Sequence, residues 1–286
     1  MSKIIECENI THYYGNRLIY ENLSFDVEQG KVLGLLGKNG TGKTTIINIL
    51  NGYLKPRSGV CRLFGEEMEH LSPLTKSKVG LLLEGHVQHA YFTVSQIEKF
   101  YSAFFPKWKK EAYYELLKNL QVLPSQKLST MSCGQRSQVA LGLLFAQDPE
   151  LLILDEPTVG LDVIARDEVL NMLREYMEEN ESSSILISSH ISSDLESLCD
   201  DFYMIHAGKI ILHEDTDVLL SDYAVLKVAE EEYEKLDQQY LIKIRKEAYG
   251  YRCLTNQKQF YMENYPDVVI ENGKIDDLVV MMEEQV

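Results

Sequence analysis

The segment KVLGLLGKNGTGKTTIINILNGYL, residues 31–54, constrains the fold of this chain more than any other. Residues 32–36 are apolar, which suits a buried parallel strand, and the residues from Thr44 onward have the apolar spacing of a helix. Between them, the residues from Gly37 to Thr44 match GxxxxGK[ST]. A glycine-rich turn that arose by chance is the alternative, and the strand-to-helix context disfavours it. We therefore predict an α/β fold with a phosphate-binding loop.

In such a loop the glycines let successive backbone N–H groups surround phosphate oxygens at the N-terminus of a helix. Lys43 is expected to reach the β and γ phosphates, and the hydroxyl of Thr44 is expected to bind Mg²⁺. The predicted nucleotide-binding residues of the loop are Gly37, Lys38, Asn39, Gly40, Thr41, Gly42, Lys43, Thr44 and Thr45.

A second apolar strand, LLILDEP at residues 151–157, ends in two acids. In a doubly wound sheet this strand end opens on the same crevice as the phosphate loop, so Asp155 is predicted to hold the metal ion. Glu156 is predicted to polarise a water molecule against the γ phosphate, as the general base of hydrolysis. The alternative makes Glu156 an ordinary exposed acid.

Two further features favour catalysis. The strand in SILISSHISSDLE delivers His190 to the same edge, where it could contact a γ phosphate. The segment TVGLD carries Asp162 away from the strand that ends in Glu156. The alternatives are a hydrogen-bonded polar residue for His190 and an ordinary strand-to-helix loop around Asp162.

Composition restricts the partners and the compartment. With 28 basic and 44 acidic residues the net charge is −16, which disfavours binding to nucleic acid. The five cysteines form no CxxC pair, which fits a reducing compartment better than a zinc site. No apolar run approaches the ~20 residues of a membrane span, and the N-terminal residues lack the apolar core of a secretory signal. We expect a cytoplasmic protein that reaches a membrane only through a partner.

The phosphate loop, MSCGQR, LILDEP, GLD and SSH occur in the order and at roughly the intervals of an ATP-binding cassette (ABC) ATPase, the engine of ABC transporters. The resemblance covers about residues 1–220, and it implies ATP and Mg²⁺ as cofactors. It implies a P-loop NTPase fold of ABC type, α/β, with an N-terminal antiparallel β-region, a mostly parallel core sheet, a helical subdomain and a small C-terminal α/β appendage.

In that family two cassettes pair head to tail, and the signature loop of one closes over the ATP held by the other. The resemblance assigns this role to Ser132, Cys133, Gly134 and Gln135, with Asp162 in the D-loop. The helix that starts near Gln135 would aim its N-terminal dipole at the partner's γ phosphate. Gly134 is expected to approach that phosphate most closely.

Two positions depart from the family pattern. Cys133 replaces the first signature glycine, at a cost of about 1–2 kcal/mol only if the backbone there is left-handed. Glu84, in VGLLLE, stands where the family commonly has Gln; it could bind Mg²⁺ or orient water, or it could be a solvated loop acid. Some bacterial exporters of the family resemble this chain in carrying Glu.

An aromatic residue before Gly15 is a candidate for stacking on adenine. Tyr14 stands directly before Gly15, where the resemblance places the stacking residue, and stacking tolerates any base. Tyr13 is the competing choice, and a packing role is the alternative for both.

Residues 86–145 are predicted to form the helical subdomain, because apolar residues recur at helical spacing on both sides of Pro106. In the family this region docks the membrane subunits. An aromatic cluster could supply such a surface, or could belong to the core; it comprises Tyr101, Phe104, Phe105 and Trp108.

Residues 1–220 are predicted to form the ATPase domain, and residues 221–286 an accessory α/β region with a helix followed by strands. This region could support the cassette or pair with its copy in a dimer.

The functional prediction is an ATP-hydrolysing subunit of an ABC transporter, of the exporter type by analogy, acting on a separate transmembrane permease. The second cassette would be identical or different, and the subunit would lie on the inner face of the membrane. A soluble mechanical ATPase acting on DNA or ribosomes is the alternative. A P-loop kinase would leave the signature loop unexplained.

Overall fold

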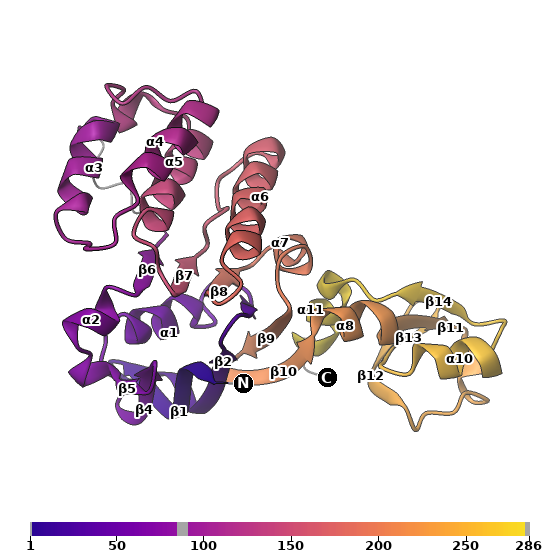
Figure 1. Cartoon of the computed structure of the whole chain (residues 1–286). Helices are drawn as coiled ribbons and strands as arrows, with labels where there is room; N and C mark the ends of the chain where they lie inside the picture. The colour runs from indigo at the N-terminus through magenta and orange to yellow at the C-terminus, as the bar shows by residue number, and fades with distance from the viewer. Residues whose placement is uncertain (1, 85–90, 284–286) are drawn as a thin grey trace.

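The computed structural model describes residues 2–84 and 91–283. Its centre is a six-stranded sheet with the strand order β10-β9-β3-β8-β7-β6, in which β10 pairs antiparallel with β9 and the other pairs are parallel (Figure 1). The strands are β3 (Val32–Leu36), β6 (Val79–Leu82), β7 (Leu151–Asp155), β8 (Ser184–Ser189), β9 (Asp201–His206) and β10 (Lys209–Asp215). Because β8 lies between β3 and β7, the strand ends with the predicted catalytic residues are adjacent.

One face of the central sheet packs on α1 and on a second, antiparallel sheet of order β2-β1-β4-β5. Leu33 and Leu35 of β3 belong to this core together with Ile46 of α1. The elements on this side are β1 (Lys3–Tyr14), β2 (Arg17–Glu28), α1 (Lys43–Leu50), β4 (Ser58–Leu63), β5 (Glu66–Glu67), η1 (Met68–His70) and α2 (Pro73–Lys76).

The other face of the central sheet packs mainly on α6 (Val163–Glu179) and α7 (Ser192–Glu196). Val32 and Leu36, which alternate with the residues of the first core, pack here with Leu173 and Leu195. Every residue of β3 and β7 is buried, because both faces of these strands are covered.

Three helices form a separate group at one end of the molecule (Figure 1). These are α3 (Val94–Ser102), α4 (Lys110–Asn119) and α5 (Cys133–Phe145), joined by the short helix η2 (Leu128–Thr130). They share a core that includes Val94, Ile97 and Leu117, as the helical spacing predicts. Residues 86–90 of the predicted subdomain lie outside the described residues.

The predicted aromatic cluster divides between the core and the surface. Trp108 packs against the core of the three helices and donates a hydrogen bond to Glu98 Oε1 at 3.0 Å. Tyr101 packs against the same core, whereas Phe104 is 66% exposed. Packing against the core therefore holds for Tyr101 and Trp108, and the docking surface stays a prediction that Phe104 is exposed enough to serve.

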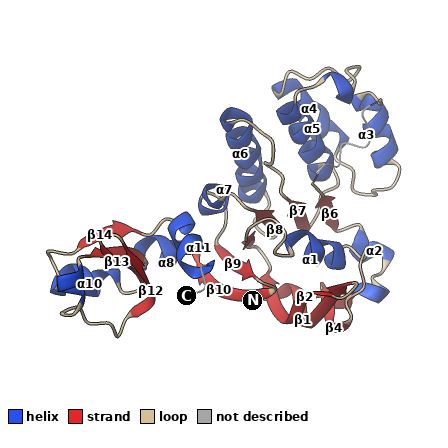
Figure 2. Cartoon of the chain, turned by 180° about the vertical axis from the view of Figure 1, so that it is seen from behind, coloured by secondary structure: helices blue, strands red, loops and turns tan. Residues whose placement is uncertain are grey.

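Residues after β10 form a third sheet, antiparallel, with the order β12-β13-β11-β14. It projects to one side, with α8 and α11 between it and the central sheet (Figure 2). Its elements are α8 (Thr216–Asp222), β11 (Ala224–Val228), α9 (Glu230–Tyr233), β12 (Leu241–Glu247), β13 (Gly250–Thr255), α10 (Lys258–Asn264), β14 (Val269–Asn272) and α11 (Ile275–Glu283). Helix α8 spans position 220, so the boundary there stays a prediction.

The arrangement of a mostly parallel sheet, an antiparallel β-region, a helical group and a C-terminal α/β part confirms the predicted fold class. Within residues 2–84 and 91–283, no helix has the length and apolar character that a bilayer crossing requires.

Candidate nucleotide site

The predicted phosphate loop joins β3 to α1, as the motif requires. Gly42 has φ of +114°, a left-handed backbone that favours glycine, and a Cβ there would collide with the ring of Tyr20. The hydroxyl of Tyr20 donates a hydrogen bond to the carbonyl oxygen of Gly42. Tyr20, from β2, therefore holds the end of the loop from which α1 begins.

The amino group of Lys43 is folded back onto the loop. Its Nζ donates to the carbonyl oxygens of Gly37 and of Lys38, the latter at 3.3 Å. It also lies 3.2 Å from Oε1 of Glu156, and the two side chains are each 5% exposed. Lys43 thus connects the loop to the end of β7.

Asp155 ends β7 with one carboxylate oxygen bonded and one unpaired. Oδ1 accepts a hydrogen bond from the hydroxyl of Ser188 at 2.6 Å. Oδ2 is buried and has no hydrogen-bond partner among the described residues. Burial raises the pKa of Asp155, and the nearby hydroxyls of Ser188 and Thr44 oppose this rise. A buried, unpaired carboxylate oxygen beside a threonine hydroxyl fits a divalent cation with oxygen ligands.

Glu156 lies between Lys43 and His190. Its Oε2 is 2.7 Å from Nδ1 of His190 and accepts a second hydrogen bond, at 3.3 Å, from the backbone N–H of that residue. Its own N–H donates to the hydroxyl of Ser188 at 3.0 Å. Its φ is +49°, a conformation that costs a non-glycine residue on the order of 1–3 kcal/mol. The neighbouring hydrogen bonds hold Glu156 in this strained position.

His190 stands in the turn between β8 and α7. The hydroxyl of Ser189 accepts a hydrogen bond from the N–H of Ile191 at 2.9 Å and donates to its carbonyl at 3.2 Å, which fixes this turn. Because the carboxylate of Glu156 accepts, Nδ1 of His190 donates, and Nε2 is the ring nitrogen that remains for a ligand.

The structure thus brings together Lys43, Asp155, Glu156 and His190 from three adjacent strand ends. Glu84 follows β6, the edge neighbour of β7, and its side chain is exposed. Among the described residues, no hydrogen bond or ion pair joins Glu84 to this group, so its role stays a prediction.

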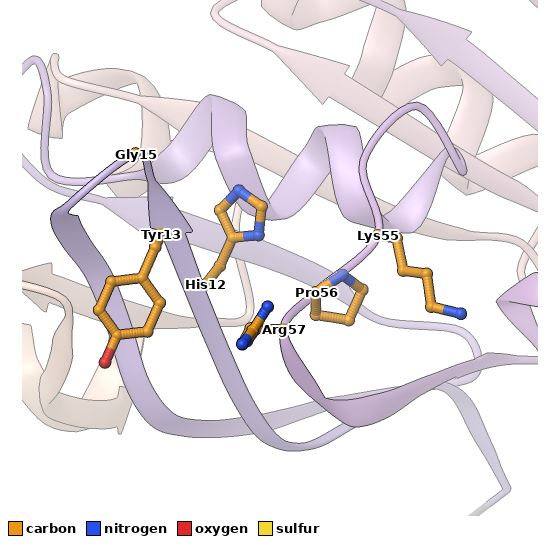
Figure 3. A pocket seen from close by; sticks show the side chains of 6 residues that line it. All are labelled: His12, Tyr13, Gly15, Lys55, Pro56 and Arg57. Carbon is orange, nitrogen blue, oxygen red and sulfur yellow. The ribbon is translucent and has the colours of Figure 1, made fainter.

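Tyr14 and Tyr13 differ in their neighbours. Tyr14 accepts a hydrogen bond from Thr45, in the first turn of α1, at 3.5 Å, and its ring is 5.1 Å from that of His12. Tyr13 lines an open pocket of about 800 Å³ together with His12, Gly15 and three residues before β4 (Figure 3). The contact with α1 favours Tyr14, which is 48% exposed, as the residue beside the nucleotide.

The predicted signature loop is the N-terminus of α5. The hydroxyl of Ser132 accepts from the N–H of Gln135 at 3.1 Å, and the side chain of Gln135 accepts in return from the N–H of Ser132 at 3.4 Å. Cys133 is the first residue of the helix and is not in the left-handed region, so the cost considered for a left-handed residue does not arise.

Gly134 is buried, and a Cβ there would lie 2.6 Å from Cβ of Ala165 in α6. Close packing of two helices is therefore a reason for this glycine that the sequence did not indicate. Asp162 caps α6, because its Oδ1 accepts from the N–H groups of Ile164 and Ala165 at 3.0 and 2.9 Å. In the described part of the chain, no hydrogen bond joins either loop to the phosphate loop.

Sequence reasoning missed Ser188, which bonds Asp155 at the end of β7 and Glu156 directly after it, and the pair formed by Thr158 and Asp194. The hydroxyl of Thr158 donates to Asp194 Oδ2 at 2.6 Å, and Asp194 is 1% exposed. Three polar residues in succession, Ser188 to His190, at the end of an apolar strand were the available signal for Ser188.

The comparisons with known proteins agree with this geometry. The family model described as "ABC transporter" matches residues 20–159. The chain is 34% identical over 213 residues to the bacitracin transport ATP-binding protein BcrA of Bacillus licheniformis, covering 74% of this chain and 69% of that protein. It is 29% identical to the Nod factor export ATP-binding protein I of Cupriavidus metallidurans, covering 74% and 71%.

Solved structures show the same fold. The ATP-binding subunit of an ABC transporter superposes with a TM-score of 0.68 at 24% identity, covering 76% of this chain and 91% of that one. A dimeric ATP-binding cassette bound to ADP and Pi, in a post-hydrolysis state, has a TM-score of 0.65 at 18% identity, covering 74% and 98%. The predicted resemblance is confirmed: the chain belongs to the ABC transporter family, as one of its ATP-binding and ATP-hydrolysing subunits.

Proposed function

We propose that two copies of this chain bind Mg·ATP between them and hydrolyse it to drive an export-type membrane permease. The observation that carries the proposal is the group formed by Lys43, Glu156 and His190, with the unpaired oxygen of Asp155 beside it. Each copy contains a phosphate loop and a signature loop, so two copies in head-to-tail contact supply two complete sites.

Binding of ATP gives Lys43 a stronger anionic partner than the loop carbonyls. As its amino group turns to the β and γ phosphates, it leaves Glu156, whose carboxylate keeps its hydrogen bonds to His190. A carboxylate without a lysine partner is the better proton acceptor for an attacking water molecule. In this account the ion pair of Lys43 and Glu156 keeps the base inactive until ATP arrives.

Asp155 and Thr44 are the residues that would hold Mg²⁺, and Glu84 could add a ligand from the neighbouring strand end. Bound there, the ion would offset the negative charge of the phosphates. Ser188 holds Asp155 Oδ1 and so leaves Oδ2 for the ion. Nε2 of His190 is assigned to the γ phosphate, and Tyr14 to the adenine ring. Across the dimer, Ser132 and Gly134 of the other copy would complete the site.

Export as the direction of transport rests on relatives. One is named for bacitracin transport and another for Nod factor export. The exposed Phe100 and Phe104, which are 58% and 66% exposed and have ring centroids 5.1 Å apart, offer a docking surface for the permease. We place the subunit on the cytoplasmic face of the membrane through this contact, with residues 221–286 as an accessory region of the ATPase domain.

The catalytic part is tested with Glu156→Gln in the purified protein. Hydrolysis should fall by about 100-fold or more while the Kd for ATP stays within about threefold, because an amide cannot accept the proton but fills the same space. Glu150→Gln is the matched control, since Glu150 precedes β7 and pairs with Lys78 at 3.2 Å away from the site. Substantial hydrolysis by Glu156→Gln would remove Glu156 from the role of base.

The transport part is tested by purifying the tagged chain from detergent-solubilised native membranes and identifying its partners by mass spectrometry. A multi-span protein in stoichiometric yield is expected. Recovery of ribosomes or DNA-associated proteins instead would favour the soluble mechanical ATPase, which the net charge of −16 disfavours.

A further inference from the structure

The C-terminal helix α11 is bonded to the short helix that follows His190. The hydroxyl of Ser192, the first residue of α7, donates to Asp276 Oδ1 at 2.6 Å. The backbone N–H of Ile275, the first residue of α11, donates to Glu196 Oε1 at 2.9 Å. The two hydrogen bonds join both ends of α7 to the first turn of α11.

Apolar packing holds α11 in the same place. Ile275, Leu278 and Met281 are buried in the core that covers the central sheet. Leu195 of α7 is fully buried in that core as well. The figures agree in placing α11 between the C-terminal sheet and the central sheet (Figures 1 and 2). A shared apolar core therefore holds α11 against α7. The two hydrogen bonds fix which end of α11 faces α7.

The opposite side of α7 is bonded to the loop that carries Glu156. Asp194 accepts from the hydroxyl of Thr158, two residues after Glu156, at 2.6 Å, and lies 3.9 Å from Nε of Arg166 in α6. Helix α7 is thus held on one side by the loop after β7 and on the other by α11.

His190 lies directly between two fixed points of the backbone. On its N-terminal side, Ser189 ends β8 and bonds both backbone groups of Ile191. On its C-terminal side, Ser192 is bonded to Asp276. Without the hydrogen bond between Ser192 and Asp276, the start of α7, and with it the ring of His190, could shift away from Glu156. The phosphate loop takes no part in this hydrogen bond.

We propose that Asp276 is a positioning residue for ATP hydrolysis: through Ser192 it fixes the backbone that carries His190, and so links the C-terminal region to the catalytic group. The proposal rests on the role assigned to His190 under the proposed function. In this account residues 221–286 influence the rate of ATP hydrolysis, because a movement of α11 would move α7 and the backbone of His190 with it.

The test compares Ser192→Ala, Asp276→Ala and the double variant in the full chain. Each single variant should lower kcat by about three- to tenfold with KM for ATP within about twofold, since the ATP-binding loop is untouched. The double variant should hydrolyse ATP no more slowly than the slower single variant, because both substitutions remove the same hydrogen bond. Ser192→Thr keeps the hydroxyl and should retain most of kcat.

Asp277→Ala is the matched control. It removes the neighbouring first-turn acid of α11, which pairs with Arg252 of β13 at 2.5 Å and not with α7. This control should leave kcat within about 1.5-fold of the unaltered chain. An equal loss of kcat in Asp277→Ala would overturn the proposal. The proposal would also be wrong if the losses of kcat in Ser192→Ala and Asp276→Ala multiplied in the double variant, or if these changes raised KM and left kcat unaltered.

His190→Ala separates failure of this inference from failure of the proposed function. If His190→Ala abolishes hydrolysis while Ser192→Ala and Asp276→Ala leave kcat unchanged, only the role of Asp276 is wrong. If His190→Ala hydrolyses ATP at the full rate, the assignment of His190 to the γ phosphate is wrong, and the positioning role is wrong with it.

Discussion

The phosphate-loop side and the signature side of the proposed ATP site differ in how their polar groups form hydrogen bonds. On the first side, Lys43, Glu156 and His190 come from three separate segments and bond to one another. On the second side, the hydrogen bonds that Ser132 and Asp162 accept within the described residues come from the starts of their own helices, α5 and α6. The first half is assembled by the topology of the sheet, whereas the second is formed locally.

The surface beside Asp162 fits this difference. Val163 and Ile164 are 77% and 74% exposed although both are large and apolar. Exposed apolar residues next to a preformed polar loop are typical of a surface that meets another protein. The comparison indicates that the polar groups of the phosphate-loop side bond to one another within the chain. The signature side, in contrast, lies beside an exposed apolar surface that another copy could contact.

The largest expected effect breaks the phosphate-loop side. Lys43→Ala should weaken ATP binding and lower hydrolysis by about 100-fold or more, since the cation that both the loop and Glu156 depend on is lost. The control is Lys55→Ala, whose lysine is exposed and pairs with Glu69 at 2.9 Å. Titration with ATP and steady-state hydrolysis measure both; a Kd unchanged by Lys43→Ala would contradict the assignment.

A smaller effect is expected within the signature side, where α5 and α6 pack against each other. Gly134→Ala places a methyl group 2.6 Å from Cβ of Ala165, too close without a shift of α5 from α6. We expect a loss of about 1–3 kcal/mol in the free energy of unfolding. Urea denaturation measures this loss, and Ala165→Gly in the same chain should restore most of it. If stability is unchanged, the helices do not pack as described.

Asp194 bonds the loop between the two halves, and its effect depends on pH. Burial raises the pKa of Asp194, so the folded chain binds this proton more tightly than the unfolded chain. The ionised carboxylate therefore lowers stability above the folded pKa, and this loss disappears as the pH falls through that value.

Asp194→Asn keeps an acceptor for Thr158 and should raise Tm by about 1–3 °C at pH 8, with a smaller gain at pH 5. Thermal unfolding at the two pH values measures the difference. The exposed Asp222, changed to Asn, is the control and should give no such trend. A gain that grows toward acid pH would show that the sign is wrong.

The smallest effect is expected on the signature side. Cys133 is helical and exposed, and its Sγ accepts a hydrogen bond from Arg136 at 3.2 Å. Cys133→Gly should change ATPase activity by less than about twofold, because no left-handed backbone needs relief there. A rise of tenfold or more in the hydrolysis rate would mean that Cys133 impairs the loop.

The sequence predicted what depends on local pattern. The strand and helix around Gly37 to Thr44 follow from the spacing and the types of neighbouring residues, whereas the helix expected to start near Gln135 begins at Cys133, after a cap at Ser132. The ion pair of Lys43 and Glu156 could not be predicted, because it depends on side-chain conformations across two strands. The contact of Ser192 with Asp276 spans 84 residues, and neither residue stands in a motif.

The most direct test of the two-half account is complementation between two inactive variants. Lys43→Ala removes only the phosphate-loop side, and Ser132→Arg removes only the signature side. A mixed dimer then contains one intact site, so mixing equal amounts should restore about a quarter of the unaltered activity if copies exchange at random and sites act independently. Activity that stays at the level of the separate variants would contradict a site shared between two copies of this chain.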